Sequence, residues 1–325
     1  MKQVVFLIAD GVLKPSGLFG AIEVFEKANE FHLHQGGKGL YEIRLAGTSL
    51  HQRMLNATFQ LNVTALEDIK RADLIILPGF DYQHDFGISK SSEALEWVVK
   101  QYHAGAEVAS LCTGTFLLAA TGLLKGKPCA THWKAEAYFR KLFPTLELHT
   151  NKIVTDQQGV YTAGGAVSSL NLALYLVEKY NGRETALYCS KVLQIDIDRH
   201  SQSPFLLFEG LKDHKDDTIR VIQDFIEQHI GERLTVDQLA IRCAMDRINF
   251  SRRFKRATQL SPADYIQRIK VEAAKRSFES TSKQINEVMY EVGYGDVKAF
   301  RSTFKKVAGM TPGDYRNKFN KVAFQ

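Results

Sequence analysis

Apolar runs and amphipathic segments alternate along the first part of the chain. The apolar runs, each short enough for one buried strand, are Val4–Ala9, Tyr41–Ala46, Leu74–Leu77 and Val108–Cys112. The segments with apolar residues at helical spacing are Leu18–Phe31, Glu93–His103, Phe116–Leu124 and Ala166–Tyr180. Strands that alternate with helices form a mostly parallel sheet with helices on both faces. The pattern therefore predicts a doubly wound α/β domain over residues 1–193.

This alternation ends in residues 194–217, which are mostly polar and contain Pro204 and Gly210. We interpret the segment as the connection between two domains. Its apolar stretch, residues 205–208, indicates that it packs against protein rather than extending freely. From Thr218 onward the apolar residues follow only the helical period. Residues 218–325 are therefore predicted to form an all-α domain.

The helical domain contains an internal repeat. Residues 254–265 recur as residues 304–315, with the same order of aromatic, basic, hydroxyl, proline and acidic positions. Each copy includes a short helix, a tight turn and a second helix. The predicted pairs are Thr235–Arg242 with Ile248–Thr258, and Ile285–Glu291 with Val297–Val307. Two helices joined in this way form a helix-turn-helix, whose second helix can enter the major groove of DNA.

Positive charge is concentrated in this helical part. Residues 215–325 contain 21 Lys and Arg against 14 Asp and Glu, and the whole chain has a net charge of +6. The faces of the second helices that point away from the core carry Arg247, Arg252, Arg253, Lys255, Arg256, Lys298, Arg301, Lys305 and Lys306. This distribution is typical of a polyanion-binding domain attached to a neutral one, and a basic, solvated surface is the alternative.

The second copy carries a specific family resemblance. The matching segments are Gly293-Tyr294, Ala299–Lys306, Gly309–Pro312 and Tyr315-Arg316. They closely resemble the AraC/XylS family of transcriptional regulators, over residues 218–320 of this chain. Membership implies that a central helix, here Ala263–Glu279, places two reading helices in successive major grooves on one side of the DNA. The resemblance and the basic faces together give these DNA-binding candidates: Ile248, Ser251, Arg252, Arg253, Val297, Lys298, Arg301 and Ser302.

The cysteines and the first apolar run indicate the cellular setting. The four cysteines are Cys112, Cys129, Cys189 and Cys243. Because they show no paired or metal-ligand spacing, we predict no disulfide, no metal and no cofactor. The first apolar run is too short for a signal sequence or a membrane span. We therefore expect a cytoplasmic protein without a membrane partner.

One candidate site lies in the α/β domain. Ser110–Gly114 joins a predicted strand to a predicted helix, and the small residues around Cys112 suit a sharp turn that presents a nucleophile. His132 follows another short strand, where it can approach the thiol. With Pro78–Phe80 and Thr162–Gly165, these segments resemble the class I glutamine amidotransferase-like superfamily, in its PfpI-like branch, over residues 1–190. The resemblance implies a flavodoxin-like fold, in whose enzymes a cysteine, a histidine and an acidic residue perform nucleophilic chemistry.

The acidic partner of those enzymes is missing here. Alignment on the equivalent helix puts Ser16 or Gly17 at its position, and Glu23 lies farther along the helix. Without that carboxylate nothing obvious orients the pair or exchanges a proton with it, so we assign no catalytic residue. The candidates for a ligand pocket are Cys112, Thr113, His132 and Gly165. Residual Cys-dependent hydrolase or hydratase activity and a purely structural cysteine–histidine pair are the alternatives.

The two predicted domains together indicate a ligand-responsive regulator. We expect a homodimer that binds double-stranded DNA sequence-specifically and is controlled by a small-molecule effector at the carboxyl ends of the strands. One rival hypothesis is a PfpI-like enzyme with a DNA-binding tail, which turnover dependent on Cys112 would favour. The other is a helical interaction module, which failure to shift any genomic DNA fragment would favour.

Overall fold

The computed structural model describes residues 1–9, 12–48, 51–54, 59–81, 91–199 and 201–320. The chain forms two compact units, Met1–Gln202 and Ser203–Gln325. The predicted connection, 194–217, is thus divided between them. Within the described ranges, no helix has both the length and the apolar character needed to cross a bilayer.

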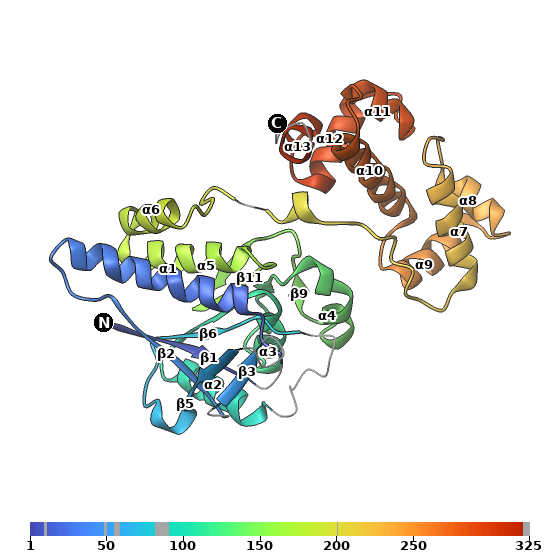
Figure 1. The fold of residues 1–325 in the computed structure, drawn as a ribbon. Helices are drawn as coiled ribbons and strands as arrows, with labels where there is room; N and C mark the ends of the chain where they lie inside the picture. Colours follow the sequence, from blue (N-terminus) through green and yellow to red (C-terminus); the bar gives the residue numbers. More distant parts are fainter. Residues whose placement is uncertain (10–11, 49–50, 55–58, 82–90, 200, 321–325) are drawn as a thin grey trace. The chain divides into compact units, whose positions relative to one another are not determined.

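The first unit is built on a seven-stranded sheet (Figure 1). From edge to edge its strands are β10 (Val154–Gln157), β11 (Val160–Ala163), β7 (Glu107–Ser110), β6 (Leu74–Leu77), β1 (Lys2–Leu7), β2 (Tyr41–Gly47) and β5 (Thr64–Ala65). All neighbours are parallel except β10 and β11, which form an antiparallel hairpin. The predicted doubly wound, mostly parallel sheet is confirmed, and the edge hairpin is an addition that the periodicity did not indicate.

Alternate side chains of β1 lie on opposite faces of this sheet. Val4 and Phe6 belong to one hydrophobic core, and Val5 and Leu7 belong to the other. The first core is covered by α1 (Pro15–His34), α5 (Ser168–Asn181) and α6 (Arg183–Val192), and the second by α2 (Ser92–His103), α3 (Thr115–Ala120) and α4 (Glu136–Leu142). Because both faces are covered, this central strand is a continuous apolar run in the sequence.

Two small ribbons lie outside the main sheet. They are the antiparallel pair β3 (His51–Met54) and β4 (Phe59–Asn62), and the parallel pair β8 (Pro128–Cys129) and β9 (Glu147–Leu148). Helix α3 ends four residues earlier than predicted. Gly122 and Gly126 follow it with φ angles of 80° and 72°, which turn the chain toward β8.

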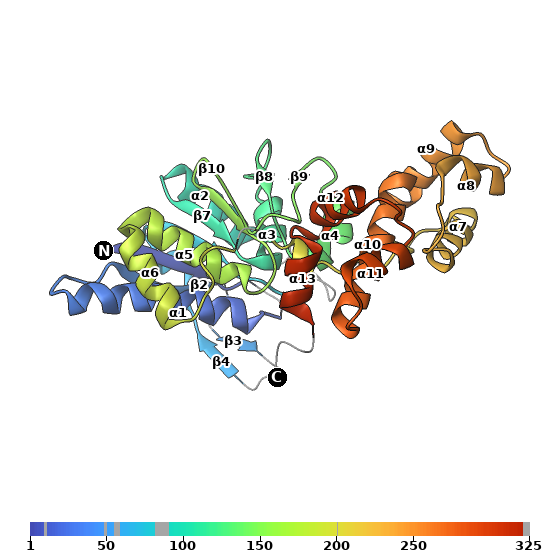
Figure 2. The ribbon, with the colours of Figure 1, turned by 90° about the horizontal axis from the view of Figure 1, so that it is seen from above.

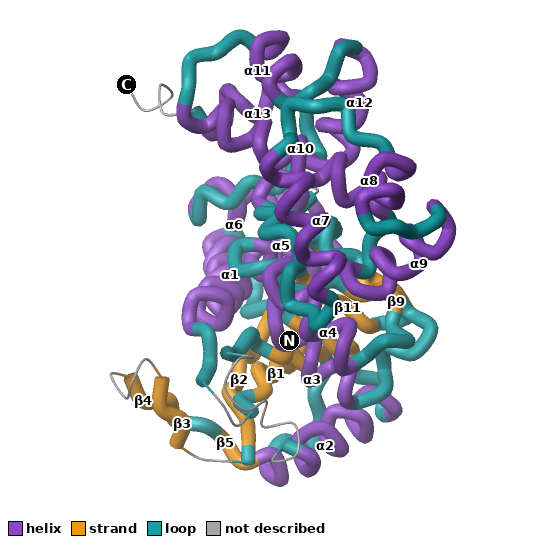
Figure 3. The backbone as a smooth tube through the Cα atoms, turned by 90° about the vertical axis from the view of Figure 1, so that its right-hand side faces the viewer, coloured by secondary structure: helices purple, strands orange, loops and turns teal. Residues whose placement is uncertain are grey.

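The second unit is entirely helical in its described part (Figure 3). Its helices are α7 (Asp217–Gln228), α8 (Val236–Arg242), α9 (Arg247–Thr258), α10 (Pro262–Ser280), α11 (Ile285–Glu291), α12 (Val297–Ala308) and α13 (Pro312–Phe319). The helix boundaries lie within one or two residues of the predicted ones. The predicted double helix-turn-helix is therefore confirmed, with α8 and α9 as the first copy and α11 and α12 as the second.

The two copies build equivalent cores around one shared helix. Phe250 and Phe254 of α9 are fully buried in the first core, and Phe300 and Phe304 of α12 are fully buried in the second. Helix α10 contributes residues to both cores, and Ile230 packs against both. The repeat in the sequence thus corresponds to two packed modules joined through α10.

Candidate functional site

Cys112 stands on a sharp turn directly after β7. Its φ angle is +56°, in the left-handed region that few residues other than glycine adopt, and only 4% of its surface is exposed. The turn is held by hydroxyls, since Thr131 Oγ1 and Thr115 Oγ1 both donate to the Cys112 carbonyl, at 2.8 and 3.1 Å. At Gly114 a Cβ atom would lie 2.1 Å from the Leu77 carbonyl oxygen, so glycine is required there. This geometry matches a strand-to-helix nucleophile elbow.

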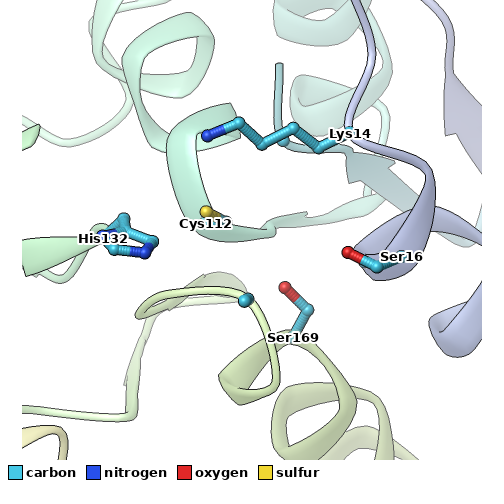
Figure 4. Close-up of a pocket in the computed structure, with 8 residues that line it drawn as sticks. Lys14, Ser16, Cys112, His132 and Ser169 are labelled. Carbon is cyan, nitrogen blue, oxygen red and sulfur yellow. The ribbon is translucent and has the colours of Figure 1, made fainter. Parts of the chain in front are cut away.

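A cavity of about 90 Å³ opens beside the Cys112 sulfur (Figure 4). Its lining comes from loops and helix starts that follow several strands, and consists of Lys14, Ser16, Gly17, Gly79, Cys112, His132, Ala166 and Ser169. The sheet order reverses between β1 and β6, which is where open α/β sheets bind ligands at their carboxyl ends. At roughly 30 Å³ for each water molecule, the cavity suits a small ligand or a small part of a larger one.

The imidazole of His132 is held in one orientation. Its Nδ1 accepts a hydrogen bond from the Lys134 backbone N–H at 3.1 Å, which places the proton of the neutral ring on Nε2. Burial lowers the pKa of His132, and the positive charges of Lys14 and Lys134 lower it further. The ring is therefore neutral at pH 7 and can donate from Nε2.

The position of the missing acid is occupied by small and basic residues. Ser16 and Gly17 both line the cavity, and Lys14 extends over it from the same loop (Figure 4). The eight described lining residues include no carboxylate. Ser169 Oγ faces the same space and is fully buried, with no hydrogen-bond partner among the described residues. The lining thus offers hydrogen-bond donors and one cation, which suits an anionic or hydrogen-bond-accepting group better than general acid–base chemistry.

The four pocket candidates have different places in this site. Cys112 and His132 both line the cavity. The Thr113 hydroxyl donates to the Phe80 carbonyl at 2.6 Å and accepts from the Phe80 N–H at 2.9 Å, so it braces the turn instead of lining the cavity. Gly165 lies directly behind the imidazole, because a Cβ atom there would be 2.6 Å from His132 Cδ2.

Sequence reasoning missed two polar residues of the lining, Lys14 and Ser169. Lys14 immediately precedes the helix-starting Pro15, and Ser169 lies in the first turn of α5 after the two glycines. Both therefore follow loops at the carboxyl ends of predicted strands, and this placement was the available signal. Nothing in the local pattern, however, gives the direction of either side chain.

In the second unit the helices α9 and α12 are presented by matching turns and caps. Ala244 and Gly293, at the two turns, have φ angles of 52° and 72°. Asp246 accepts from the N–H groups of Ile248 and Asn249, and Asp296 accepts from the Ala299 N–H, so each helix begins at an aspartate cap. Both helices lie on the same side of α10 (Figures 2 and 3).

Most of the DNA-binding candidates are open to solvent. Ile248 is 71% exposed, although isoleucine is one of the residues most often buried. The other exposed candidates are Arg252, Lys298, Arg301 and Ser302. Ser251 and Val297 are half-buried at the edges of the two helices.

The Arg253 side chain forms an ion pair within the helical unit. Its guanidinium donates to both carboxylate oxygens of Asp216, at 2.7 and 2.9 Å, and to Thr218 Oγ1 at 3.1 Å. The bond from Arg253 lowers the pKa of Asp216, which also caps α7 by accepting from the Ile219 N–H. Arg253 therefore attaches the recognition helix of the first copy to α7.

Two family models match the chain, one in each unit. Residues 2–179, more than half of the chain, match the DJ-1/PfpI family. Residues 239–318 match a helix-turn-helix domain. The two matches are consistent with the cysteine elbow in the first unit and the repeated helix pairs in the second.

Similar proteins include two regulators that align with this chain over most of their length, and one enzyme. The chain is 25% identical to the HTH-type transcriptional regulator GbdR of Pseudomonas aeruginosa over 324 residues, covering 97% of this chain and 84% of that protein. It is 23% identical to the HTH-type transcriptional regulator CdhR of the same species, covering 96% and 90%. It is also 29% identical to the isonitrile hydratase of Pseudomonas putida over 146 residues, covering 44% and 58%.

A solved structure supports the fold of the first unit. An AraC family transcriptional regulator from Pseudomonas putida superposes with a TM-score of 0.51 at 16% identity, covering 59% of this chain and 100% of that one. From these matches and the geometry above, the chain belongs to the DJ-1/PfpI family and ends in an AraC-type helix-turn-helix domain, which makes it a DNA-binding transcriptional regulator.

Proposed function

We propose that this regulator binds a small molecule in the cavity beside Cys112 and changes its affinity for an operator in response. The observation that carries the proposal is a cavity beside an elbow cysteine whose described lining has Ser16 and Gly17, the residues aligned with the missing acid, together with Lys14 and no carboxylate. A thiol and an imidazole with no carboxylate among the described lining residues to orient them support binding better than turnover. The effector enters with an anionic or accepting group toward Lys14 and Ser169.

Operator recognition is assigned to the solvent-facing residues of the two recognition helices. We assign forked hydrogen bonds to guanine to the exposed Arg252 and Arg301, and base or phosphate contacts to the exposed Lys298 and Ser302. Ile248, Val297 and Ser251 complete the reading surface. We assign Arg253 to holding α9 in position, because its guanidinium is bound to Asp216.

Paired half-sites and a homodimer complete the proposal. Regulators that read two related half-sites commonly match them with two-fold protein symmetry. We place this homodimer in the cytoplasm, where its scattered, unpaired cysteines stay reduced.

DNA selection tests the proposed operator binding. Genomic fragments are selected on the full-length protein, and the recovered sequence is used in gel shifts at a stated salt concentration. Replacing Arg252 and Arg301 by alanine should weaken binding by about 1–3 kcal/mol for each lost base contact. Arg183→Ala, in the α/β unit, serves as the control and should leave the affinity unchanged. Equal affinity of the double variant and the parent chain would remove α9 and α12 as the reading helices.

The similarity to isonitrile hydratase and the elbow at Cys112 favour one second candidate, a Cys-dependent hydratase or hydrolase that also binds DNA. Incubation with an isonitrile tests it directly. Product formation that disappears in Cys112→Ser, while operator binding is retained, would establish this alternative. Absence of turnover with an intact pocket would leave ligand binding as the function of the cavity.

A further inference from the structure

The last residue of the α/β unit, Gln202, is buried beside segments that carry two residues of the pocket lining. Only 1% of the Gln202 surface is exposed. Its Nε2 donates to the carbonyls of Thr131, Thr150 and Lys152 at 3.2, 2.9 and 2.9 Å, and its Oε1 accepts from the Gly165 N–H at 2.6 Å. The amide is thus surrounded by backbone groups on every side, and both ends of it are satisfied.

Two of these backbone groups belong to residues that adjoin the pocket lining in the chain. Thr131 directly precedes His132, and Gly165 directly precedes Ala166, and both following residues line the cavity. The two adjacent glycines, Gly164 and Gly165, make room for different side chains. At Gly164 a Cβ atom would lie 2.1 Å from Gln202 Cδ, and at Gly165 it would lie 2.6 Å from His132 Cδ2. The glycine pair therefore admits the glutamine on one side and the imidazole on the other.

The chain that follows Gln202 is bound along the helical unit. We call residues 203–210 the strap. The Phe205 ring meets Phe319 of α13 edge-on at 5.7 Å, and the Leu206 carbonyl accepts from Lys275 Nζ of α10. The Phe208 ring then meets Tyr265 at 5.4 Å.

The end of the strap is also bound. The Gly210 carbonyl accepts from Gln223 Nε2 at 2.6 Å and from the Tyr265 hydroxyl at 2.9 Å. The strap therefore contacts the modules of both helix-turn-helix copies and the helix that joins them. Along the chain, only Ser203 and Pro204 separate Gln202 from Phe205, the first strap residue whose ring packs on the helical unit.

We propose that Gln202 is the residue that couples the pocket to the DNA-binding helices. An occupant that displaces His132 or Ala166 moves the Thr131 carbonyl and the Gly165 N–H, and the buried amide must follow its partners or lose them. Either response moves the adjoining strap, whose contacts span both helix-turn-helix modules. The inference rests on the proposed function, because it presumes that pocket occupancy alters operator binding.

The test uses iodoacetamide as a defined occupant of the pocket. The Cys112 sulfur displaces iodide and gains a carbamidomethyl group, and its proton goes to the buffer. Burial raises the pKa of Cys129 to about 12 and that of Cys189 to about 11, so these two thiols stay protonated and unreactive. Cys243→Ser removes the remaining thiol, and mass spectrometry verifies a single modification at Cys112.

Operator affinity is then measured for the unmodified and modified forms of three full-length proteins on the Cys243→Ser background. In the parent we expect alkylation to change the dissociation constant at least five-fold. In Gln202→Met, which keeps the side-chain volume without its hydrogen bonds, the two forms should agree within two-fold. Gln101→Met is the matched control, because Gln101 is another buried glutamine that binds a backbone N–H, that of Ala72, and it should retain the parent's shift.

The possible outcomes separate the two proposals. A shift that persists in Gln202→Met would overturn the coupling role and leave the proposed function intact. No shift in the parent would contradict control of DNA binding by the pocket, and the coupling role with it. If Gln202→Met does not fold, Gln202→Asn replaces it, since the shorter amide cannot reach the Gly165 N–H. Faster hydrogen exchange at Gly165 in either variant verifies that the contact is lost.

Discussion

At the scale of single residues, the pocket depends on contacts that leave no room for an extra atom. Gly165 packs against the imidazole of His132, and Gly17 packs against Ser169. A Cβ atom added at Gly17 would lie 3.2 Å from Ser169 Oγ. The first contact is far below van der Waals distance, and the second needs only a small adjustment of a hydroxyl that has no hydrogen-bond partner in the described part of the chain. The two glycines therefore differ in how much they constrain the site.

We predict that Gly165→Ala displaces His132 and destabilises the α/β unit by about 1–3 kcal/mol, the usual cost of overpacking. Gly17→Ala should stay within about 0.5 kcal/mol of the parent, because it is a tolerated change in a helix. Both tryptophans, Trp97 and Trp133, lie in this unit, so urea unfolding followed by tryptophan fluorescence reports on it alone. Equal stability of the two variants would contradict this assignment.

The lowered pKa of His132 predicts a loss of stability on acidification. Well above its ordinary pKa of 6.5 the ring is neutral in both the folded and the unfolded chain, so it does not change the free energy of unfolding with pH. As the pH falls below 6.5 the unfolded chain binds the proton first, so the free energy of unfolding decreases. His132→Gln should remove this component. Fluorescence-detected urea unfolding at pH 7.5 and pH 5.5 measures it, and an identical pH dependence in the variant would exclude the effect.

The residues of the candidate site differed in how far the sequence revealed them. Cys112 stood out because a strand-to-helix elbow has a local signature, and His132 because it belongs to a recognisable segment. Gln202 had no such signature, since it is bound to four backbone groups that come from residues 131–165. Contacts made over such separations depend on tertiary structure, which neither periodicity nor motif spacing encodes.

At the scale of secondary structure, the helix-turn-helix copies were the most predictable part. Their helices combine strong apolar periodicity with aspartate, serine or threonine caps, and those signals are local. The edge hairpin of β10 and β11 and the short helix α4 were not predicted, because short segments carry too few apolar repeats to define a period.

The two copies differ at the turn, and this difference is testable. Ala244 has a φ angle of 52°, which costs a residue with a Cβ atom about 1–2 kcal/mol. We therefore expect Ala244→Gly to stabilise the first copy by about 1 kcal/mol. At Gly293 a Cβ atom would lie 2.6 Å from Lys270 Nζ and 2.8 Å from the Gly231 carbonyl oxygen, so Gly293→Ala should destabilise the second copy by more than that.

Hydrogen exchange of the amides in α8, α9, α11 and α12 resolves the two copies separately. Slower exchange in α8 and α9 of Ala244→Gly, and faster exchange in α11 and α12 of Gly293→Ala, are the expected results. Opposite signs would mean that the turn conformations are not as described. The variant that carries both Ala244→Gly and Gly293→Ala serves as a control, because additive effects on exchange would show that the two turns act independently.

At the scale of the whole molecule, the α/β unit does not end where the polar composition begins. The sequence placed the boundary at residue 193, but the compact unit extends to Gln202. Ile195 is buried in the core of that unit, and the Asp196 carbonyl accepts from Asn171 Nδ2 at 2.7 Å. The polar segment after α6 therefore belongs to the folded α/β unit.

We predict that a fragment of residues 1–193 is markedly less stable than a fragment of residues 1–202. The shorter fragment loses the Gln202 side chain and leaves the Gly165 N–H and three carbonyls without their partner, at about 1–3 kcal/mol for each group that stays buried. Thermal unfolding of both fragments, followed by tryptophan fluorescence, measures the difference. Equal melting temperatures would show that residues 194–202 add nothing to the stability of the α/β unit.

The sharing of α10 between two hydrophobic cores has a consequence for the target sequence. Because α10 is one continuous helix, it fixes the distance along the duplex between the two blocks of bases that the copies read. That distance is about one helical repeat of 10–10.5 base pairs. Inserting a single base pair between the blocks would turn one of them out of phase with its reading helix. Aligned target sites should therefore contain blocks with an invariant gap. For the proposed homodimer, a gap that varies among sites would mark the junction between its two copies.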